Sequence, residues 1–86
     1  MPKSQTKNAA NRWKSGAVKA IQAGEYQKAI TALSHALKKE PDNDLLYISR
    51  AIAFSKIKEP QKTKEDLLRA ASLGNEKAMQ YLAKFN

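Results

Sequence analysis

Residues 13–37 read WKSGAVKAIQAGEYQKAITALSHAL, and residues 47–71 read YISRAIAFSKIKEPQKTKEDLLRAA. The two stretches align without a gap at an offset of 34 positions. The matched residues keep their size class: Trp13 with Tyr47, Ala17 with Ala51, Val18 with Ile52, Leu33 with Leu67, and Ala36 with Ala70. The same offset carries Tyr47 onto Tyr81. Recurrence in one register predicts tandem copies of a single structural unit.

Each unit contains two helical patterns, because apolar residues recur at three- and four-residue steps and nowhere alternate as in a strand. Glycine or proline interrupts these patterns at positions 24, 41, 60 and 74. The predicted helices cover 9–23, 26–39, a stripe from 45 to 54, 60–73, and a stretch after Asn75, which can cap it. The sequence therefore predicts an all-α solenoid of five helices in antiparallel helix-turn-helix repeats. We expect a flexible basic tail over residues 1–8, repeats over 9–41 and 42–74, and a capping helix over 75–86.

This pattern resembles the tetratricopeptide repeat (TPR) family, whose units read W-x-x-L-G-x-x-Y, then A-x-x-x-F, A and P. The first unit follows it with Trp13-x-x-Gly16-Ala17-x-x-Ala20, Ala29-x-x-x-Leu33, Ala36 and Pro41. The second unit follows it with Tyr47-x-x-Arg50-Ala51-x-x-Phe54, Leu67 and Ala70. It departs from the pattern at Pro60 and Thr63, and no proline closes it. The resemblance covers about residues 11–86, and residues 70–82 are also similar to the related Sel1-like repeats.

The composition narrows the class of protein. The chain has 86 residues, 42% of them hydrophobic, and no cysteine, so disulfides and thiol chemistry are excluded. No apolar run reaches the roughly 18 residues of a membrane span, and the polar N-terminus is unlike a secretory signal. We therefore expect a soluble, cytoplasmic protein. The net charge of +8 either favours acidic partners or only keeps the domain in solution.

No residue pattern indicates catalysis. His35 is the only histidine, and it lies between core positions of a helix, which favours a structural or surface role. Glu40, Asp42 and Asp44 cluster at a turn without EF-hand spacing, which fits charges at a helix start. No phosphate-binding loop or nucleophile motif is present. We expect neither enzymatic activity nor a metal or cofactor.

The resemblance implies a concave groove lined by the first helix of each unit. In this register the groove residues are Asn11, Lys14, Val18, Gln22, Leu45, Ser49, Ile52 and Lys56, together with Ile21, Ile48, Ser55, Met79 and Leu82. Such an apolar strip with basic flanks predicts binding of a peptide or protein segment, acidic or mixed apolar and acidic; alternatively, some of these side chains only pack between helices. The basic clamp with which chaperone-binding relatives hold a carboxylate is mostly missing, because only Lys14 matches it.

A second basic surface is predicted at Lys58, Lys62 and Lys64, next to Lys56 and with Arg69 further along the helix. It leaves open an alternative function as a nucleic-acid-binding accessory protein. Against that alternative, Trp13, Tyr47 and Tyr81 fall on packing positions, where they are not free to stack on bases. A third hypothesis is an assembly unit that self-associates through the uncovered ends of the solenoid. The oligomeric state stays open.

Overall fold

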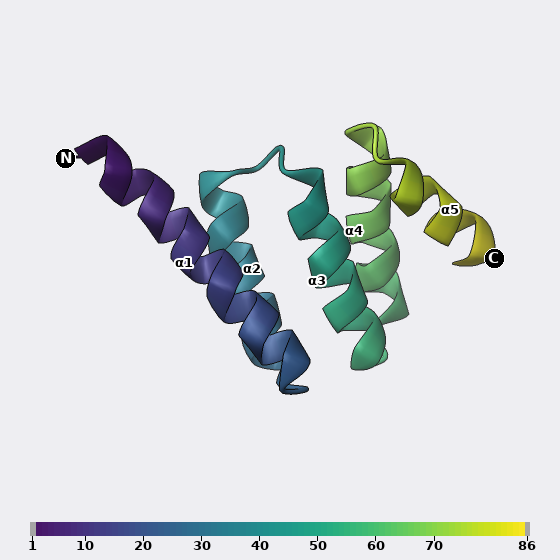
Figure 1. Cartoon of the computed structure of the whole chain (residues 1–86). Coiled ribbons are helices and arrows are strands. Elements are labelled where there is room, and N and C mark those ends of the chain that lie inside the picture. Colours follow the sequence, from purple (N-terminus) through teal and green to yellow (C-terminus); the bar gives the residue numbers. More distant parts are fainter. Residues whose placement is uncertain (1, 86) are drawn as a thin grey trace.

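A computed structural model describes the backbone of residues 2–85 and the side chains of residues 11–85. Within that part of the chain all regular structure is helical (Figure 1). The helices are α1 (Pro2–Gln22), α2 (Tyr26–Lys39), α3 (Asp44–Lys56), α4 (Pro60–Ser72) and α5 (Glu76–Phe85). The predicted all-α class with five helices is confirmed.

The N-terminal segment differs from the prediction. Residues 1–8 were expected to form a flexible basic tail; Met1 lies outside the described residues, and α1 already begins at Pro2. Proline is tolerated in the first turn of a helix because its missing N–H has no partner there. From Lys3 to Ser15 the sequence contains neither glycine nor proline, so nothing interrupts a helix that started at Pro2.

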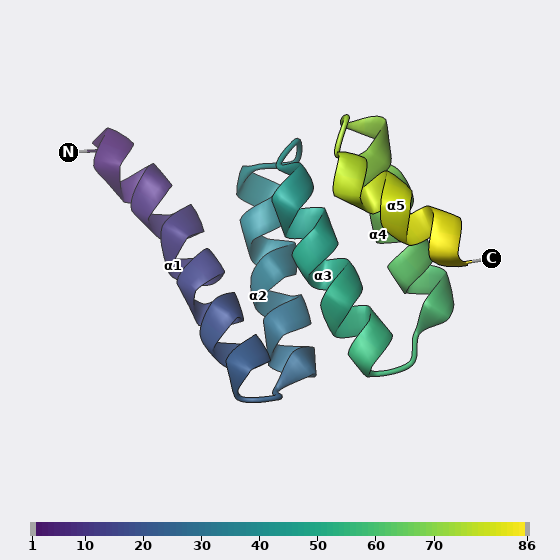
Figure 2. The ribbon, with the colours of Figure 1, turned by 45° about the vertical axis from the view of Figure 1, so that its right-hand side comes forward.

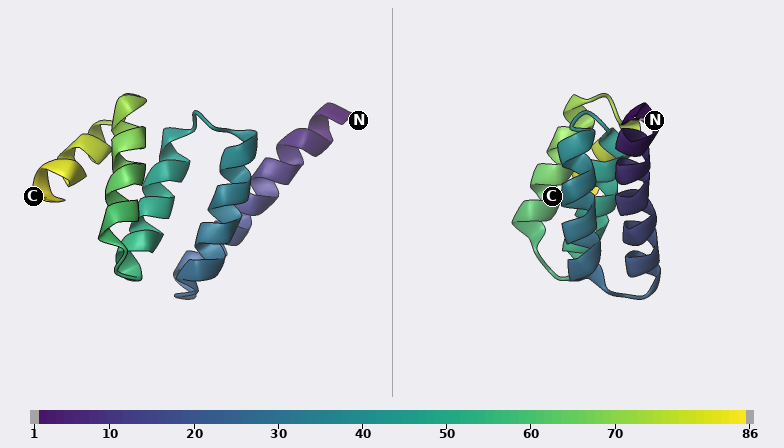
Figure 3. Two further views of the ribbon diagram at one scale, coloured as in Figure 1. Left: turned by 180° about the vertical axis from the view of Figure 1, so that it is seen from behind. Right: turned by 90° about the vertical axis from the view of Figure 1, so that its left-hand side faces the viewer.

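The helices follow one another along the long axis of the molecule, and successive helices run in opposite directions (Figures 1 and 2). Each helix packs chiefly on its neighbours in the sequence, and the two chain ends lie at opposite ends of the row (Figure 3, left). The Cα atoms span 47 × 28 × 16 Å. Short loops between antiparallel helices produce this arrangement, since each helix must return along the one before it.

The core is built from small residues that allow close approach and from leucines that fill the space beside them. Ala17 and Ala51 are each 1% exposed. Leu33 and Leu67 are buried next to them, as the repeat register predicts. Five further alanines are completely buried, at positions 29, 36, 53, 70 and 78. Large and small side chains interlock in this way, which lets neighbouring helices pack closely.

Three positions depart from the predicted packing. The apolar stripe of the predicted helix over 60–73 consists of Leu67, Leu68, Ala70 and Ala71, and Leu68 was therefore expected on the core side. It is half exposed, and the buried residues of α4 are Thr63, Asp66, Leu67 and Ala70. Trp13 was expected to fill space between the repeats, yet it is 38% exposed and stacks on His35 at 4.3 Å between ring centroids. Ile48 was expected in the groove but is buried against the cluster that includes Leu67. A wide apolar arc on a helix does not show which part of it faces a neighbour.

Three of the four turns have the same backbone geometry. At the ends of α1, α3 and α4, an N–H bonds back to the carbonyl five residues earlier, and the preceding N–H bonds to the carbonyl three residues earlier. This pair of bonds defines a Schellman motif, whose key residue has a positive φ. The residue with positive φ is Gly24 (+77°) after α1, Lys58 (+61°) after α3 and Gly74 (+96°) after α4. The predicted stops at Gly24 and Gly74 are confirmed.

Candidate functional site: a groove between α3, α4 and α5

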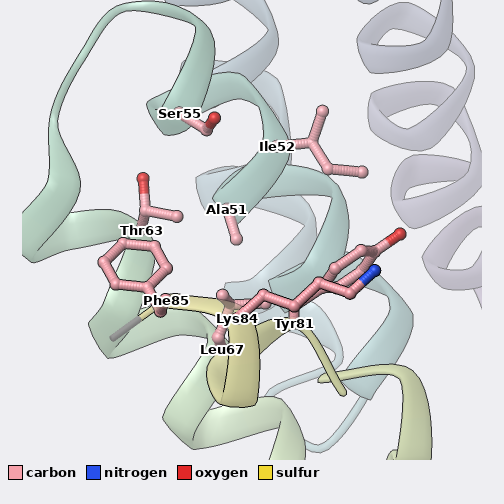
Figure 4. Close-up of a pocket in the computed structure, with 8 residues that line it drawn as sticks. All are labelled: Ala51, Ile52, Ser55, Thr63, Leu67, Tyr81, Lys84 and Phe85. Atoms are coloured by element: carbon pink, nitrogen blue, oxygen red, sulfur yellow. The ribbon is translucent and has the colours of Figure 1, made fainter. Parts of the chain in front are cut away.

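A pocket of about 250 Å³ opens between α3, α4 and α5 (Figure 4). Its lining is mainly apolar, and Figure 4 shows side chains from all three helices around it. The lining residues are Ala51, Ile52 and Ser55 of α3, Thr63 and Leu67 of α4, and Tyr81, Lys84 and Phe85 of α5. Ala51 and Leu67 are almost completely buried, so they form its floor.

The pocket exists because α5 packs on α4 and leaves a space beside α3. Ala78 is the one fully buried residue described in α5, and it joins the cluster formed by Ile48, Leu67 and Ala70. Beyond Ala78 the helix continues with Tyr81 and Phe85, which are 43% and 38% exposed. Residues at i, i+3 and i+4 share one face of a helix, so Tyr81, Lys84 and Phe85 together form the outer wall.

A second pocket, of about 260 Å³, adjoins the first and shares Ser55, Thr63 and Phe85 with it. It extends to the α3–α4 turn, where Lys58, Glu59 and Pro60 line it. The Thr63 hydroxyl donates a hydrogen bond to the Glu59 carbonyl at 2.8 Å, so this hydroxyl needs no partner from a ligand. We call the two pockets together the α3–α5 groove.

The predicted groove residues do not all lie in one pocket of the structure. Of the eight main residues, Ile52 lines the first pocket, next to Ser55 from the wider set. The others lie along α1 and α3 outside both pockets: Asn11, Val18, Gln22, Leu45 and Lys56 are exposed, and Ser49 is half-buried. Val18 and Leu45 are 54% and 63% exposed, so they remain available to a partner. A single concave surface that joins all eight stays a prediction.

Lys14 already has a partner within the chain. Its ammonium group lies 2.8 Å from a carboxylate oxygen of Glu40, and the Asn43 side chain donates to the same oxygen at 2.8 Å. The hydrogen bond from Lys14, and then that from Asn43, lowers the pKa of Glu40 below its ordinary value. Lys14 therefore links α1 to the α2–α3 turn, and a ligand carboxylate would have to compete with Glu40.

The predicted basic patch consists of exposed lysines with different neighbours. Lys58 lines the second pocket, Lys62 lies over the Phe54 ring at 5.6 Å, and Lys64 is exposed on α4. Arg69 has separate partners near the other end of α4, because it lies 3.9 Å from Asp42 and over the Tyr47 ring. The lysines at the start of α4 and Arg69 therefore do not form one uniform surface.

Several residues that shape the groove were missed or misjudged from the sequence. Tyr81 was placed on a packing position of the repeat, and neither Lys84 nor Phe85 was assigned to a binding surface. The spacing of 81, 84 and 85 places them on one face, and that signal could have grouped them. The spacing alone does not predict that this face of α5 borders a pocket. The tilt of α5 relative to α3 depends on how Ala78 packs on α4.

The acidic residues at the α2–α3 turn do not converge on one point. Glu40 pairs with Lys14, Asp42 with Arg69, and Asp44 accepts a hydrogen bond from Asn75 at 2.8 Å. Among the side chains described, those of residues 11–85, no three histidine or acidic groups are arranged to hold a metal ion. None of the described helices has both the length and the apolar character needed to cross a bilayer.

A scan of the chain against models of known protein families gives no match.

Proposed function

We propose that this chain is a TPR-like helical repeat module that binds a segment of another protein and catalyses no reaction. The segment occupies the α3–α5 groove, and it is acidic or mixed apolar and acidic. The observation that carries the proposal is the apolar pocket between α3, α4 and α5, which is open at the surface and framed by Lys84.

Two features support the repeat family. The 34-residue register places Ala17 and Ala51 at equivalent, fully buried positions. It also places Gly24 and Lys58 at equivalent positions of the same turn geometry. One feature departs from the pattern, since α4 and α5 are joined by this tight turn and not by a proline-containing loop like that between α2 and α3.

The size and chemistry of the pocket support a protein ligand. An apolar cavity of about 150 Å³ can hold a benzene molecule, so a pocket of about 250 Å³ accommodates one large apolar side chain. Ile52, Tyr81 and Phe85 each expose about two-fifths of their surface around it. An apolar side chain that entered the pocket would cover this surface and be held by the hydrophobic effect.

The decisive experiment is selection from a displayed library of random peptides with the purified chain, followed by affinity measurements on synthetic versions of the selected sequences. We expect selected peptides to share one large apolar residue near acidic residues. Ile52→Asp should weaken their binding by about tenfold or more, because a charge would be placed at the edge of an apolar pocket.

The matched control is Leu68→Asp, which places the same charge on an exposed apolar residue of α4 outside the groove. It should leave binding unchanged. Val18→Asp tests in addition whether the binding surface extends to α1, as the predicted eight-residue groove requires. Failure to select any peptide, or equal loss of binding in Ile52→Asp and Leu68→Asp, would contradict the proposal.

The exposed lysines at the start of α4 support nucleic-acid binding as a second candidate function. Its weakness is that two of the aromatic residues are engaged within the chain: Trp13 stacks on His35, and the Arg50 and Arg69 guanidinium groups lie over the Tyr47 ring. Phosphate contacts lose affinity steeply with salt. A titration of RNA and DNA at low salt, repeated at higher salt, tests this function, and absence of binding at low salt would remove it.

A further inference from the structure

We propose that the α3–α5 groove recognises an internal protein segment in which one large apolar side chain is flanked on both sides by acidic side chains. This inference deepens the proposed function and rests on it. It concerns the order of chemical groups along the groove, which has a basic group near each end and an apolar centre.

The centre of the groove favours an apolar side chain, because Ser55 is the one shared lining residue whose hydroxyl has no hydrogen bond within the described chain. Ala51 and Leu67 form the floor, and Thr63 and Phe85 line the same pocket (Figure 4). The Thr63 hydroxyl is already bonded to the Glu59 carbonyl. A polar ligand group placed here would lose most of its hydrogen bonds to water without replacement, which is unfavourable.

One end of the groove carries two hydrogen-bond donors, the Lys84 ammonium and the Tyr81 hydroxyl. They are three residues apart on α5, so they lie on the same face of the helix. Figure 4 shows both polar ends toward the side of the pocket where Ile52 lies, away from Phe85 and Thr63. No ion pair within the described chain occupies Lys84. A carboxylate at this end could accept from both groups.

The other end carries Lys58 in a strained conformation. Gly24 and Gly74 occupy the same position in the two related turns, where φ is positive. A lysine with φ +61° bears a conformational cost that glycine avoids. Strain of this kind points to a role for the side chain, and Lys58 lines the second pocket. Glu59 lines the same pocket and would repel an acidic ligand group. Such a group would therefore lie on the side of the pocket where Lys58 is.

The geometry favours an internal acidic segment over other occupants. The two pockets adjoin through shared residues, so a bound chain can continue past Phe85 in both directions. A second copy of this chain is disfavoured by its net charge of +8. In addition, two acidic groups of its α2–α3 turn are held at 2.8 Å, Glu40 by Lys14 and Asp44 by Asn75. Nucleic acid would match the charge but not the apolar floor.

The test uses three acetylated, amidated peptides that share a central phenylalanine or leucine. In the first the flanking residues are glutamate, in the second glutamine, and in the third lysine. We expect the glutamate peptide to bind about tenfold more tightly than the glutamine peptide, and the lysine peptide more weakly still. Added salt should reduce the difference between the first two.

Charge-reversal variants then test whether Lys84 and Lys58 each bind an acidic group at their end of the groove. Lys84→Glu and Lys58→Glu should each weaken binding of the glutamate peptide, and the double variant should prefer the lysine peptide. Lys77→Glu on α5 and Lys64→Glu on α4 make the same change in net charge at exposed residues outside the groove. Lys58→Gly removes the ammonium while keeping the turn geometry, so it tests that end even if Lys58→Glu alters the turn.

The possible results distinguish the flanking-charge inference from the proposed peptide-binding function. Equal binding of all three peptides, with loss in Ile52→Asp, would overturn the flanking-charge inference and leave peptide binding intact. Absence of binding by all three would count against the proposed function itself. Equal weakening by the Lys77 and Lys64 controls would show a general charge effect and overturn the assignment of Lys84 and Lys58. Concentration-dependent association of the chain alone, abolished by Ile52→Asp, would identify a second copy as the occupant.

Discussion

Arg50 lies between three helices and forms the most buried ion pair of the described chain. Its guanidinium contacts both carboxylate oxygens of Asp66, at 2.8 and 2.7 Å, and donates to the Ser34 hydroxyl at 3.0 Å. The Asp66 side chain is 6% exposed. The hydrogen bond to Asp66 raises the pKa of Arg50, as expected for a charge-assisted pair. The bidentate geometry fixes the relative positions of α2, α3 and α4.

Replacing one residue of the Arg50–Asp66 pair should lower the free energy of unfolding more than replacing both. Asp66→Leu leaves the Arg50 guanidinium without its acceptor, and we expect the free energy of unfolding to fall by about 2–3 kcal/mol. The double variant Arg50→Met with Asp66→Leu should recover most of that loss, because no buried charge then remains. Urea denaturation measures both. Asp42→Leu serves as control and should change stability by less than about 0.5 kcal/mol, since Asp42 is largely exposed. Equal stability of the single and double variants would contradict this reasoning.

The spacing of residues on α4 contains a signal for this pair. Thr63, Asp66, Leu67 and Ala70 share one face of the helix, so an acidic residue lies on an otherwise buried stripe. A buried carboxylate needs a partner, and the sequence thus indicates that a base must be near. Which base that is depends on the rotation of α3 against α4, and that rotation is a property of the packed helices.

Among the helix–helix connections, the α3–α4 turn is the strained one. It has the same hydrogen bonds as the α1–α2 and α4–α5 turns, but a lysine replaces glycine at the positive φ. The chain therefore tolerates a local cost at Lys58 that glycine would remove.

We expect Lys58→Gly to raise the free energy of unfolding by about 0.5–1 kcal/mol, which is the relief of the left-handed conformation less the entropy of glycine in the unfolded chain. The matched variant Lys64→Gly, inside α4, should lower stability by about 1 kcal/mol. Thermal and denaturant unfolding compare the two. A loss of stability in Lys58→Gly would show that the lysine side chain makes a stabilising contact that outweighs the strain.

Helix α5 is held at its start more firmly than along its length. The Asn75 side chain accepts a hydrogen bond from the Ala78 N–H at 2.9 Å and donates to Asp44 at 2.8 Å. The predicted role of Asn75 as the cap of the fifth helix is confirmed. The same residue also ties the start of α5 to the start of α3, which the sequence did not predict.

Asn75→Ala should lower stability by about 1–2 kcal/mol, because it removes a helix cap and a tertiary hydrogen bond. The effect should be local, so amide hydrogen exchange should accelerate in α5 more than in α2. Asn75→Ser keeps an acceptor for the cap and should recover part of the loss. Uniform acceleration across all helices would mean that α5 does not open separately.

Among the side chains of residues 11–85, polar links connect helices that the apolar core alone would leave free to slide. They join α1 to the α2–α3 turn through Lys14 and Glu40, α2 to α3 and α4 through Arg50, and the start of α3 to the α4–α5 turn through Asn75. Directional hydrogen bonds fix a register that small, uniform alanines do not specify.

The first of these links makes stability depend on pH. The pKa of Glu40 is lower in the folded protein than its ordinary value of 4.5, so the unfolded chain takes up the proton first as the pH falls. The contribution of Glu40 is therefore complete well above pH 4.5 and is lost as the pH falls through the lowered folded value. We expect Glu40→Gln to be less stable than the wild type near pH 7, with a difference that shrinks on acidification. Urea unfolding from pH 7 to pH 3 measures this difference, and a constant difference would exclude the Lys14–Glu40 pair as its cause.

The sequence by itself determined the number of helices, the boundaries set by Gly24, Pro41, Pro60 and Gly74, and the burial of the alanines in register. These features are local or periodic, because a turn residue acts through its own φ and an apolar stripe acts through the pitch of one helix.

The tertiary structure alone decided where α5 lies beside α3, that Ile52 meets Tyr81 and Lys84 at one pocket, and that Lys14 is paired with Glu40. The sequence predicted that Ile52 lines a groove, but not that this groove lies between α3, α4 and α5. It also predicted Ile48 in the groove, whereas Ile48 is buried in the core. The physical reason is that the tilt between helices follows from the sum of many weak side-chain contacts. No single residue carries that information.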